Sequence, residues 1–214
     1  MIDLSILKDR KHIWISVSGG VDSASLLYLI ASYVTDVEIT PWCVVDTTRP
    51  GNDIAAQKII DVVSKRTGFI FNNLVVDYIT KEPGGNKNKL IYPIFKRMQA
   101  SGLYDCYVDA LSAAPLIEEM KSIKGFYEAF KRITTEDRTS RDNITHRYSN
   151  KFLFFKPYLN IDKQAIADIY EDHDLMNDLF PLTESCVGRD KTPCMECFWC
   201  HEKYWAFGMY DMGQ

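Results

Sequence analysis

The sequence predicts an α/β fold, a doubly wound parallel sheet with helices on both faces. Short apolar runs rich in β-branched and aromatic residues alternate along the chain with longer segments whose apolar residues recur at helical spacing. A glycine- and serine-rich turn joins the first such run to the first such segment. Strands that alternate with helices are joined by right-handed crossovers, so they pair in parallel and bind ligands beyond their carboxyl ends.

The first two strands follow from these patterns. We expect a strand over 12–17 (HIWISV), and then a helix whose apolar stripe runs from Leu26 to Val34. A second strand is expected over 42–46 (WCVVD). Pro41 can only start this strand, because proline donates no hydrogen bond to a sheet ladder.

Later elements are marked by caps and by further apolar runs. Asp53 is expected to cap the second helix, which ends at Gly68. Asp162 is expected to cap a helix that reaches Asp172. A further helix is expected over 91–99, and further strands over 73–76, 104–108 and 152–155.

Two polar segments interrupt the alternation. Residues 80–89 (TKEPGGNKNK) form a glycine-rich loop, which we interpret as a mobile flap. Residues 131–151 mix basic and acidic side chains. Either a solvated surface segment or a lid over phosphates would give that pattern, and the sequence leaves both open.

Composition limits the classes of protein. The chain has 214 residues, of which 46% are hydrophobic and 25% charged. A chain of this length and hydrophobic content can bury a core. We expect an α/β domain over 1–180 and a C-terminal segment over 181–214 packed on it. The formal net charge is −4, so no overall basic field favours a nucleic acid partner. No signal peptide and no apolar run of membrane-spanning length is recognised, so we expect a cytoplasmic protein without membrane contact.

The turn after the first strand reads SGGVDS and consists of Ser18, Gly19, Gly20, Val21, Asp22 and Ser23. The first amides of a helix lack intrahelical acceptors and the helix dipole is positive there, so an anion is favoured. Two glycines let the backbone approach phosphates, and the serines add uncharged donors. Asp22 would repel a bare phosphate, which suggests an intervening Mg²⁺. The alternative is a tight turn capped by serine, without a ligand.

Four cysteines lie close together near the end of the chain. Cys186, Cys194, Cys197 and Cys200 form the pattern C-x7-C-x2-C-x2-C, which supplies enough thiolates for a closed tetrahedral zinc site. Such a site has no open position, so we expect Zn²⁺ to be structural. Isolated reduced thiols, or a redox-active pair of Cys194 and Cys197, are the alternatives. The other two cysteines, at 43 and 106, are expected in the core.

The S-G-G-x-D-S loop resembles the pyrophosphate loop of the PP-loop ATP pyrophosphatase family, enzymes that split ATP between its α and β phosphates. This resemblance implies a Rossmann-like sheet of the adenine nucleotide α-hydrolase type. It also implies that Val45 and Asp46, at the end of the second strand, border the adenosine, with the backbone of Val45 reading the adenine edge.

The loop and the cysteine tail together resemble one family, the 7-cyano-7-deazaguanine synthases. The tail matches an L-T-x-x-C pattern at 182–186 and C-x2-C-x2-C-H at 194–201, and FFKPYLNIDKQAIADIYEDHDL is also similar. By this resemblance Lys163 faces the α-phosphate or the intermediate; an exposed lysine in a first helical turn is the alternative. The middle departs from the family, with IYPIFKRMQASGLYDC and VDALSAAPLIEEMKS in place of its substrate-side segments.

The resemblance implies a ligase that adenylates a carboxylate, 7-carboxy-7-deazaguanine, using ATP, Mg²⁺ and ammonia. Asp22, Ser23 and Lys163 are then the catalytic residues. The adenylate becomes an amide, and a second adenylation with loss of AMP leaves the nitrile, a precursor of queuosine and archaeosine. Two other classes stay open: a sulfur-handling enzyme, either a tRNA thiolase or a sulfonucleotide reductase, and a noncatalytic nucleotide-binding module. The oligomeric state is also open, with a homodimer among the options.

Overall fold

The computed structural model describes residues 2–48, 50–80, 87–133, 138–188 and 192–212. They form one six-stranded sheet in the order β3-β2-β1-β4-β6-β5. The strands are β1 (His12–Ser16), β2 (Glu38–Asp46), β3 (Val75–Ile79), β4 (Cys106–Val108), β5 (His146–Ser149) and β6 (Phe152–Phe155). All pairings are parallel except that of β5 with β6 at the edge. The predicted α/β class is confirmed.

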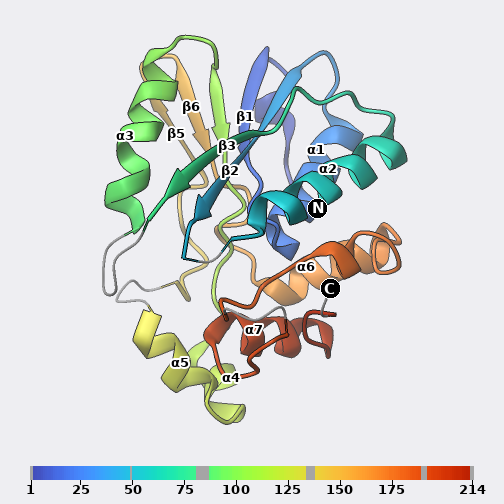
Figure 1. Ribbon diagram of the computed structural model, residues 1–214, viewed down its shortest axis with the longest axis vertical. Coiled ribbons are helices and arrows are strands. Elements are labelled where there is room, and N and C mark those ends of the chain that lie inside the picture. Colours follow the sequence, from blue (N-terminus) through green and yellow to red (C-terminus); the bar gives the residue numbers. More distant parts are fainter. Residues whose placement is uncertain (1, 49, 81–86, 134–137, 189–191, 213–214) are drawn as a thin grey trace.

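Helices cover both faces of this sheet (Figure 1). One face carries α1 (Val21–Tyr33), α2 (Asn52–Thr67) and α6 (Lys163–Asp172), and the other carries α3 (Lys87–Ala100). A separate group lies beyond the carboxyl ends of the strands and consists of α4 (Ile117–Ser122), α5 (Phe126–Ile133) and α7 (Phe198–Phe207). Short 3-10 turns span Ser5–Leu7 and Phe180–Leu182. Within the described ranges, no helix is long and apolar enough to cross a membrane.

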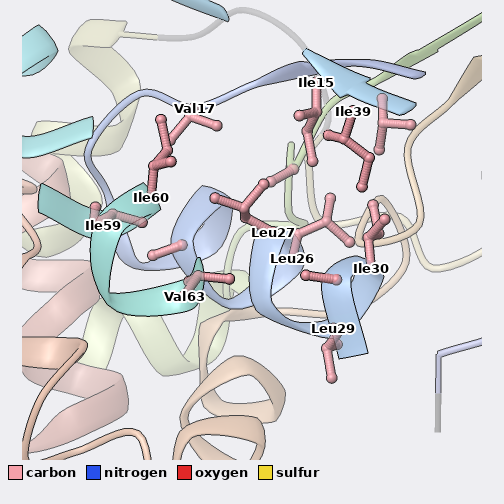
Figure 2. Packing of buried hydrophobic residues seen from close by; sticks show 14 of the residues in the cluster. Ile15, Val17, Leu26, Leu27, Leu29, Ile30, Ile39, Ile59, Ile60 and Val63 are labelled. Carbon is pink, nitrogen blue, oxygen red and sulfur yellow. The ribbon is translucent and has the colours of Figure 1, made fainter. Parts of the chain in front are cut away.

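The two faces of the sheet have different cores. Aliphatic side chains fill the layer between the sheet and α1 and α2, with Ile15 and Ile39 facing Leu26 and Ile30 (Figure 2). Because side chains alternate along a strand, the neighbours of these residues point to the opposite face. That face is aromatic, with Trp14 packed among the rings of Trp42, Tyr107, Phe95 and Tyr104 under α3. The predicted core cysteines, at 43 and 106, are both fully buried.

Several sequence-based boundaries were wrong, among them the starts of the fourth strand, at Cys106 and not 104, and of α3, at Lys87 and not 91. Pro41 lies inside β2, not at its start. It is tolerated because it faces β3, and the pairing of β2 with β3 begins only one residue later, at Trp42 and Val75. The third strand starts at Val75, two residues later than expected. Gly51, in the left-handed region with φ +118°, is the N-cap of α2, so Asp53 lies in the first turn and does not cap it. By contrast, Asp162 caps α6 as predicted, accepting from the amides of Gln164 and Ala165.

The two polar segments can be followed only in part. Of the expected flap, residues 81–86 lie outside the described residues, and α3 begins at Lys87. Of the charged segment 131–151, residues 134–137 lie outside them. Its described part ends α5 and then forms β5, an exposed edge strand that the sequence reading missed. Alternation of polar with polar residues in HRYS gives no strand signal, because neither face of that strand is buried.

Candidate functional site

The SGGVDS loop joins the carboxyl end of β1 to the first turn of α1. Gly19 has φ +87°, and a Cβ built on it would lie 3.1 Å from the Cβ of Ala55 in α2. A glycine is therefore required both by the backbone and by the close approach of α2. Gly20 is the N-cap of α1 and no side chain caps this helix, so the serine-capped turn considered above is not found.

Hydroxyl groups hold the loop in shape from inside. The Ser23 hydroxyl donates to the Gly20 carbonyl at 3.1 Å and accepts from the Ser18 amide at 3.1 Å. The two serine hydroxyls lie 3.2 Å apart. From α2, the side-chain amide of Asn52 donates to the Ser18 carbonyl at 3.0 Å. These bonds preorganise a loop that begins a helix, the geometry in which backbone amides bind anions.

Asp22, in the first turn of α1, meets Lys163, the first residue of α6. The Lys163 Nζ lies 3.1 Å from Oδ1 and 3.2 Å from Oδ2 of Asp22, and 3.1 Å from Oε2 of Glu202 in α7. The Lys163 side chain is only 5% exposed and that of Glu202 1%. The exposed-lysine alternative is therefore excluded. Burial opposes the charged form of Lys163, but the attraction of the two carboxylates outweighs it and raises its pKa.

The segment that follows β4 completes this charged group. The Ser112 hydroxyl donates to Oδ2 of Asp22 at 3.1 Å. Arg138 donates to the Ser112 carbonyl at 2.7 Å. Arg141 donates to the Ala114 carbonyl and pairs with Asp162, both at 3.0 Å. Arg138 and Arg141 thus fasten their part of the charged segment to the site, whereas β5 in the same segment is exposed.

Val45 and Asp46 end β2, which lies next to β1 in the sheet. The Val45 side chain is buried, and Oδ1 of Asp46 accepts from the amide and the hydroxyl of Thr48. The carboxyl ends of β1 and β2 are adjacent in the sheet, so these residues lie on the same edge as the loop. Their contact with an adenine stays a prediction.

The four tail cysteines come together in the structure. Their Sγ atoms all lie within 4.8 Å of one another, and Sγ of Cys194 is 3.8 Å from Sγ of Cys200. Zinc–sulfur bonds of about 2.3 Å in a tetrahedron place the sulfurs about 3.8 Å apart, so the set fits one such ion. A four-iron cluster holds its thiolates farther apart, because the irons lie between them.

Hydrogen bonds connect these sulfurs to the backbone and to one another. The Sγ of Cys186 accepts from the amides of Gly188 and Cys194, both at 3.2 Å. A hydrogen bond from Cys200 lowers the pKa of Cys197 to about 4, and the same hydrogen bond, with burial, raises the pKa of Cys200. The grouping argues against isolated thiols. His201, next to the last cysteine, stacks on Phe126 instead of joining the set.

A buried ion pair fastens the same segment at a second point. Lys203, 1% exposed, pairs with Oδ1 of Asp211 at 2.6 Å and donates to the hydroxyl of Thr183 at 3.0 Å. The other oxygen of Asp211 accepts from the amides of Ser185 and Cys186. The end of the described chain is therefore tied to the first cysteine without any metal.

Sequence reasoning missed Ser112, Arg138, Glu202 and the Lys203–Asp211 pair. One signal was present for Glu202 and Lys203. They lie in the middle of FWCHEKYWAF, an otherwise largely apolar and aromatic helix, where charged residues are rarely buried unless paired. No comparable signal marked Ser112 or Arg138.

Comparisons with known proteins show the fold of this chain and nothing more specific. No family model matches the chain, and no curated protein matches it. Among solved structures, it is similar to the U34-tRNA thiolase NcsA from Methanococcus maripaludis with its [4Fe-4S] cluster, with a TM-score of 0.51 and 12% identity over 81% of this chain and 61% of that one. An NMN synthetase from Francisella tularensis aligns with a TM-score of 0.44 and 13% identity over 81% and 66%. The chain spans less than two thirds of either protein, and the likeness to the thiolase shows a shared fold alone.

Proposed function

We propose that this protein is an ATP-dependent adenylating enzyme, which transfers AMP to an acceptor oxygen and releases pyrophosphate. One observation carries the proposal: the S-G-G-x-D-S loop begins α1 at the carboxyl edge of the sheet, with the Asp22–Lys163 pair beside it. Loop amides and a lysine ammonium are the groups that stabilise charge on a transferring phosphoryl group. The resemblance of this loop to the pyrophosphate loop of the PP-loop family supports the same reaction.

The residues also fit a magnesium ion. Asp22 supplies a carboxylate, 22% exposed, at the loop, which suits a hard cation that prefers oxygen ligands. A bound Mg²⁺ would offset the negative charge of the phosphates there. Asp22 would hold it, Ser23 would fix the loop, and Lys163 would bind a phosphate oxygen. These groups act by positioning and charge stabilisation, and the acceptor supplies the nucleophile.

For the acceptor we propose 7-carboxy-7-deazaguanine, on the resemblance of the two ends of the chain to 7-cyano-7-deazaguanine synthases. Its carboxylate oxygen attacks the α-phosphorus, and pyrophosphate leaves. Ammonia then displaces AMP and forms the amide. The amide oxygen attacks a second ATP, pyrophosphate leaves again, and elimination of AMP with loss of the amide protons gives the nitrile. The four cysteines would hold a structural Zn²⁺ in the same tail.

A sulfur-handling function has less support. All six cysteines lie in the described ranges, and the two outside the tail cluster, Cys43 and Cys106, are fully buried. A thiol that carries sulfur to a substrate must be accessible and form a thiolate readily. Burial raises the pKa of Cys106, which opposes that role.

The test is product analysis by chromatography and mass spectrometry. Zinc-loaded protein is incubated with ATP, Mg²⁺, ammonium and 7-carboxy-7-deazaguanine, and AMP, pyrophosphate, an amide and then the nitrile are expected. Asp22→Ala should abolish turnover, whereas Asp168→Ala, on the exposed side of α6, should not change it. Release of AMP with another carboxylate only would keep the reaction and discard this substrate. Release of ADP, or no cleavage with any acid, would contradict adenylation.

A further inference from the structure

Helix α7, which carries Cys200, places one charged side chain, that of Glu202, beside the proposed nucleotide site. Glu202 lies two residues after Cys200, and its Oε2 is 3.1 Å from the ammonium of Lys163. Lys163 in turn pairs with Asp22 of the loop. Three helices, α1, α6 and α7, therefore meet in one row of alternating charges, of which Lys163 and Glu202 are buried and Asp22 is partly exposed. Helices α6 and α7 pack side by side (Figure 1).

This contact differs from the ion pair formed by the next residue. Lys203 pairs with Asp211 and Thr183, so its bonds stay within the C-terminal segment and fasten it. Glu202 instead reaches out of that segment to Lys163. Since Lys203 and the cysteines already fasten α7, a second buried charge is not needed for that purpose, and burying a carboxylate is costly unless its partner requires it.

The charge of Lys163 explains why a second carboxylate is useful. A lysine side chain is flexible, and its ammonium shares Asp22 with Ser112. When the Asp22 carboxylate turns to a magnesium ion, that ion pair weakens. Glu202, at 3.1 Å and 1% exposed, then remains as the anion that keeps the ammonium beside the loop.

We propose that Glu202 positions Lys163 for the phosphates, and that the metal held by the four cysteines thereby controls the nucleotide site. The inference rests on the proposed function for the role of Lys163. Glu202 is a positioning residue: it acts through Lys163 and does not touch the nucleotide. Without the metal, α7 keeps the Lys203–Asp211 pair but loses the anchor at its start, where Cys197 and Cys200 lie, so that Glu202 withdraws and Lys163 leaves the loop.

The first test does not need ATP. Lysines are acylated under limiting reagent, and the modification of Lys163 is quantified by mass spectrometry. Lys163 should be protected in zinc-loaded protein and should become several-fold more reactive in Glu202→Gln, with its zinc content unchanged. Glu171→Gln, exposed on the same helix as Lys163, is the matched control. Zinc removal by a chelator should give the same increase while the circular dichroism of the sheet is retained. Unchanged reactivity of Lys163 in both cases would overturn the inference.

The second test uses the kinetics of AMP formation. Glu202→Gln should lower kcat/KM for ATP by tenfold or more, and Glu202→Asp should recover part of it. In a Lys163→Met background, Glu202→Gln should cause no further loss, because its only effect is through that lysine. Equal losses in both backgrounds would show a merely structural role. Should the zinc-loaded wild type neither bind nor cleave Mg-ATP, the proposed function fails, and the acylation result alone decides whether Glu202 positions Lys163.

Discussion

The two ends of the chain build the site by opposite means. The SGGVDS loop is contiguous, is held by neutral hydroxyls and backbone groups, and rests on the sheet and on Ala55 of α2. The C-terminal segment carries α7, brings its four cysteines together and is held by buried ion pairs at Glu202 and Lys203. The loop therefore depends on local geometry, whereas the tail depends on buried charges and on the grouping of its cysteines. The loop should therefore tolerate changes of pH and metal concentration but not substitutions that alter its backbone or its packing. The C-terminal segment should be sensitive to pH and to metal removal.

The largest effect is expected at the cysteines. Cys197→Ser removes one of four thiolates, and structural zinc contributes about 10 kcal/mol or more of apparent binding free energy to small zinc domains at neutral pH. We expect loss of about one zinc per chain and melting of the C-terminal segment at a lower temperature than the sheet. Glu196→Gln, exposed in the same segment, should change neither. Metal analysis measures the zinc content, and calorimetry measures the melting temperatures. A protein that is fully stable without metal would contradict a structural zinc site.

Acid should reproduce this loss in the unmodified protein, because protons compete with the metal for thiolates. Lowering the pH should release zinc and separate the melting of the tail from that of the sheet, and raising it again in the presence of zinc should restore a single transition. A zinc content that is independent of pH while the tail unfolds would show that the metal does not hold it.

The buried ion pair of the tail comes next. Lys203→Met leaves Asp211 buried and unpaired, and breaking such a pair costs about 3–5 kcal/mol. Urea unfolding measures the change, and Lys65→Met, exposed at the end of α2, provides the control. A loss below about 1 kcal/mol, the range of surface pairs, would mean that the tail is held by its cysteines alone.

The loop can be tested by shape alone. Gly19→Ala forces a Cβ into a positive φ and within 3.1 Å of Ala55, and the backbone term costs about 1–2 kcal/mol. Gly102→Ala imposes a similar φ, +68°, with nothing within 4 Å. The free energy of unfolding should therefore fall more in the first variant, and only the first should lose Mg-ATP affinity. Equal effects on both would mean that the close approach of α2 does not constrain the loop.

The smallest effect is expected at the start of α6. Asp162→Ala removes the side chain that accepts from two helix amides, which costs about 1 kcal/mol. Asp162→Asn keeps the cap while it weakens the ion pair with Arg141, so the two variants separate these contributions. Lys163 directly follows Asp162. A fall in kcat/KM greater than the loss of folding free energy explains would therefore show that the cap also positions the Lys163 side chain.

Local signals account for what the sequence predicted well. The loop, the Asp162 cap and the cysteine spacing each lie within a few residues, so propensity and spacing are sufficient to recognise them. The Lys163–Glu202 pair joins separate helices, and no local pattern specifies which buried charges will meet. Pro41 was misplaced for a similar reason, because its acceptability depends on where the neighbouring strand β3 begins. The exposed strand β5 carries no hydrophobic alternation by which to find it.

The connection between α1 and α6 also orders events during synthesis. Lys163 contacts a residue 141 positions earlier, and the Tyr170 hydroxyl donates to the Val21 carbonyl 149 positions earlier. Ribosomes add about 5–20 residues per second, so the loop waits on the order of ten seconds before its lysine is made. Contacts of such long range also slow folding. A nascent chain therefore carries the complete SGGVDS loop long before Lys163 exists to pair with Asp22.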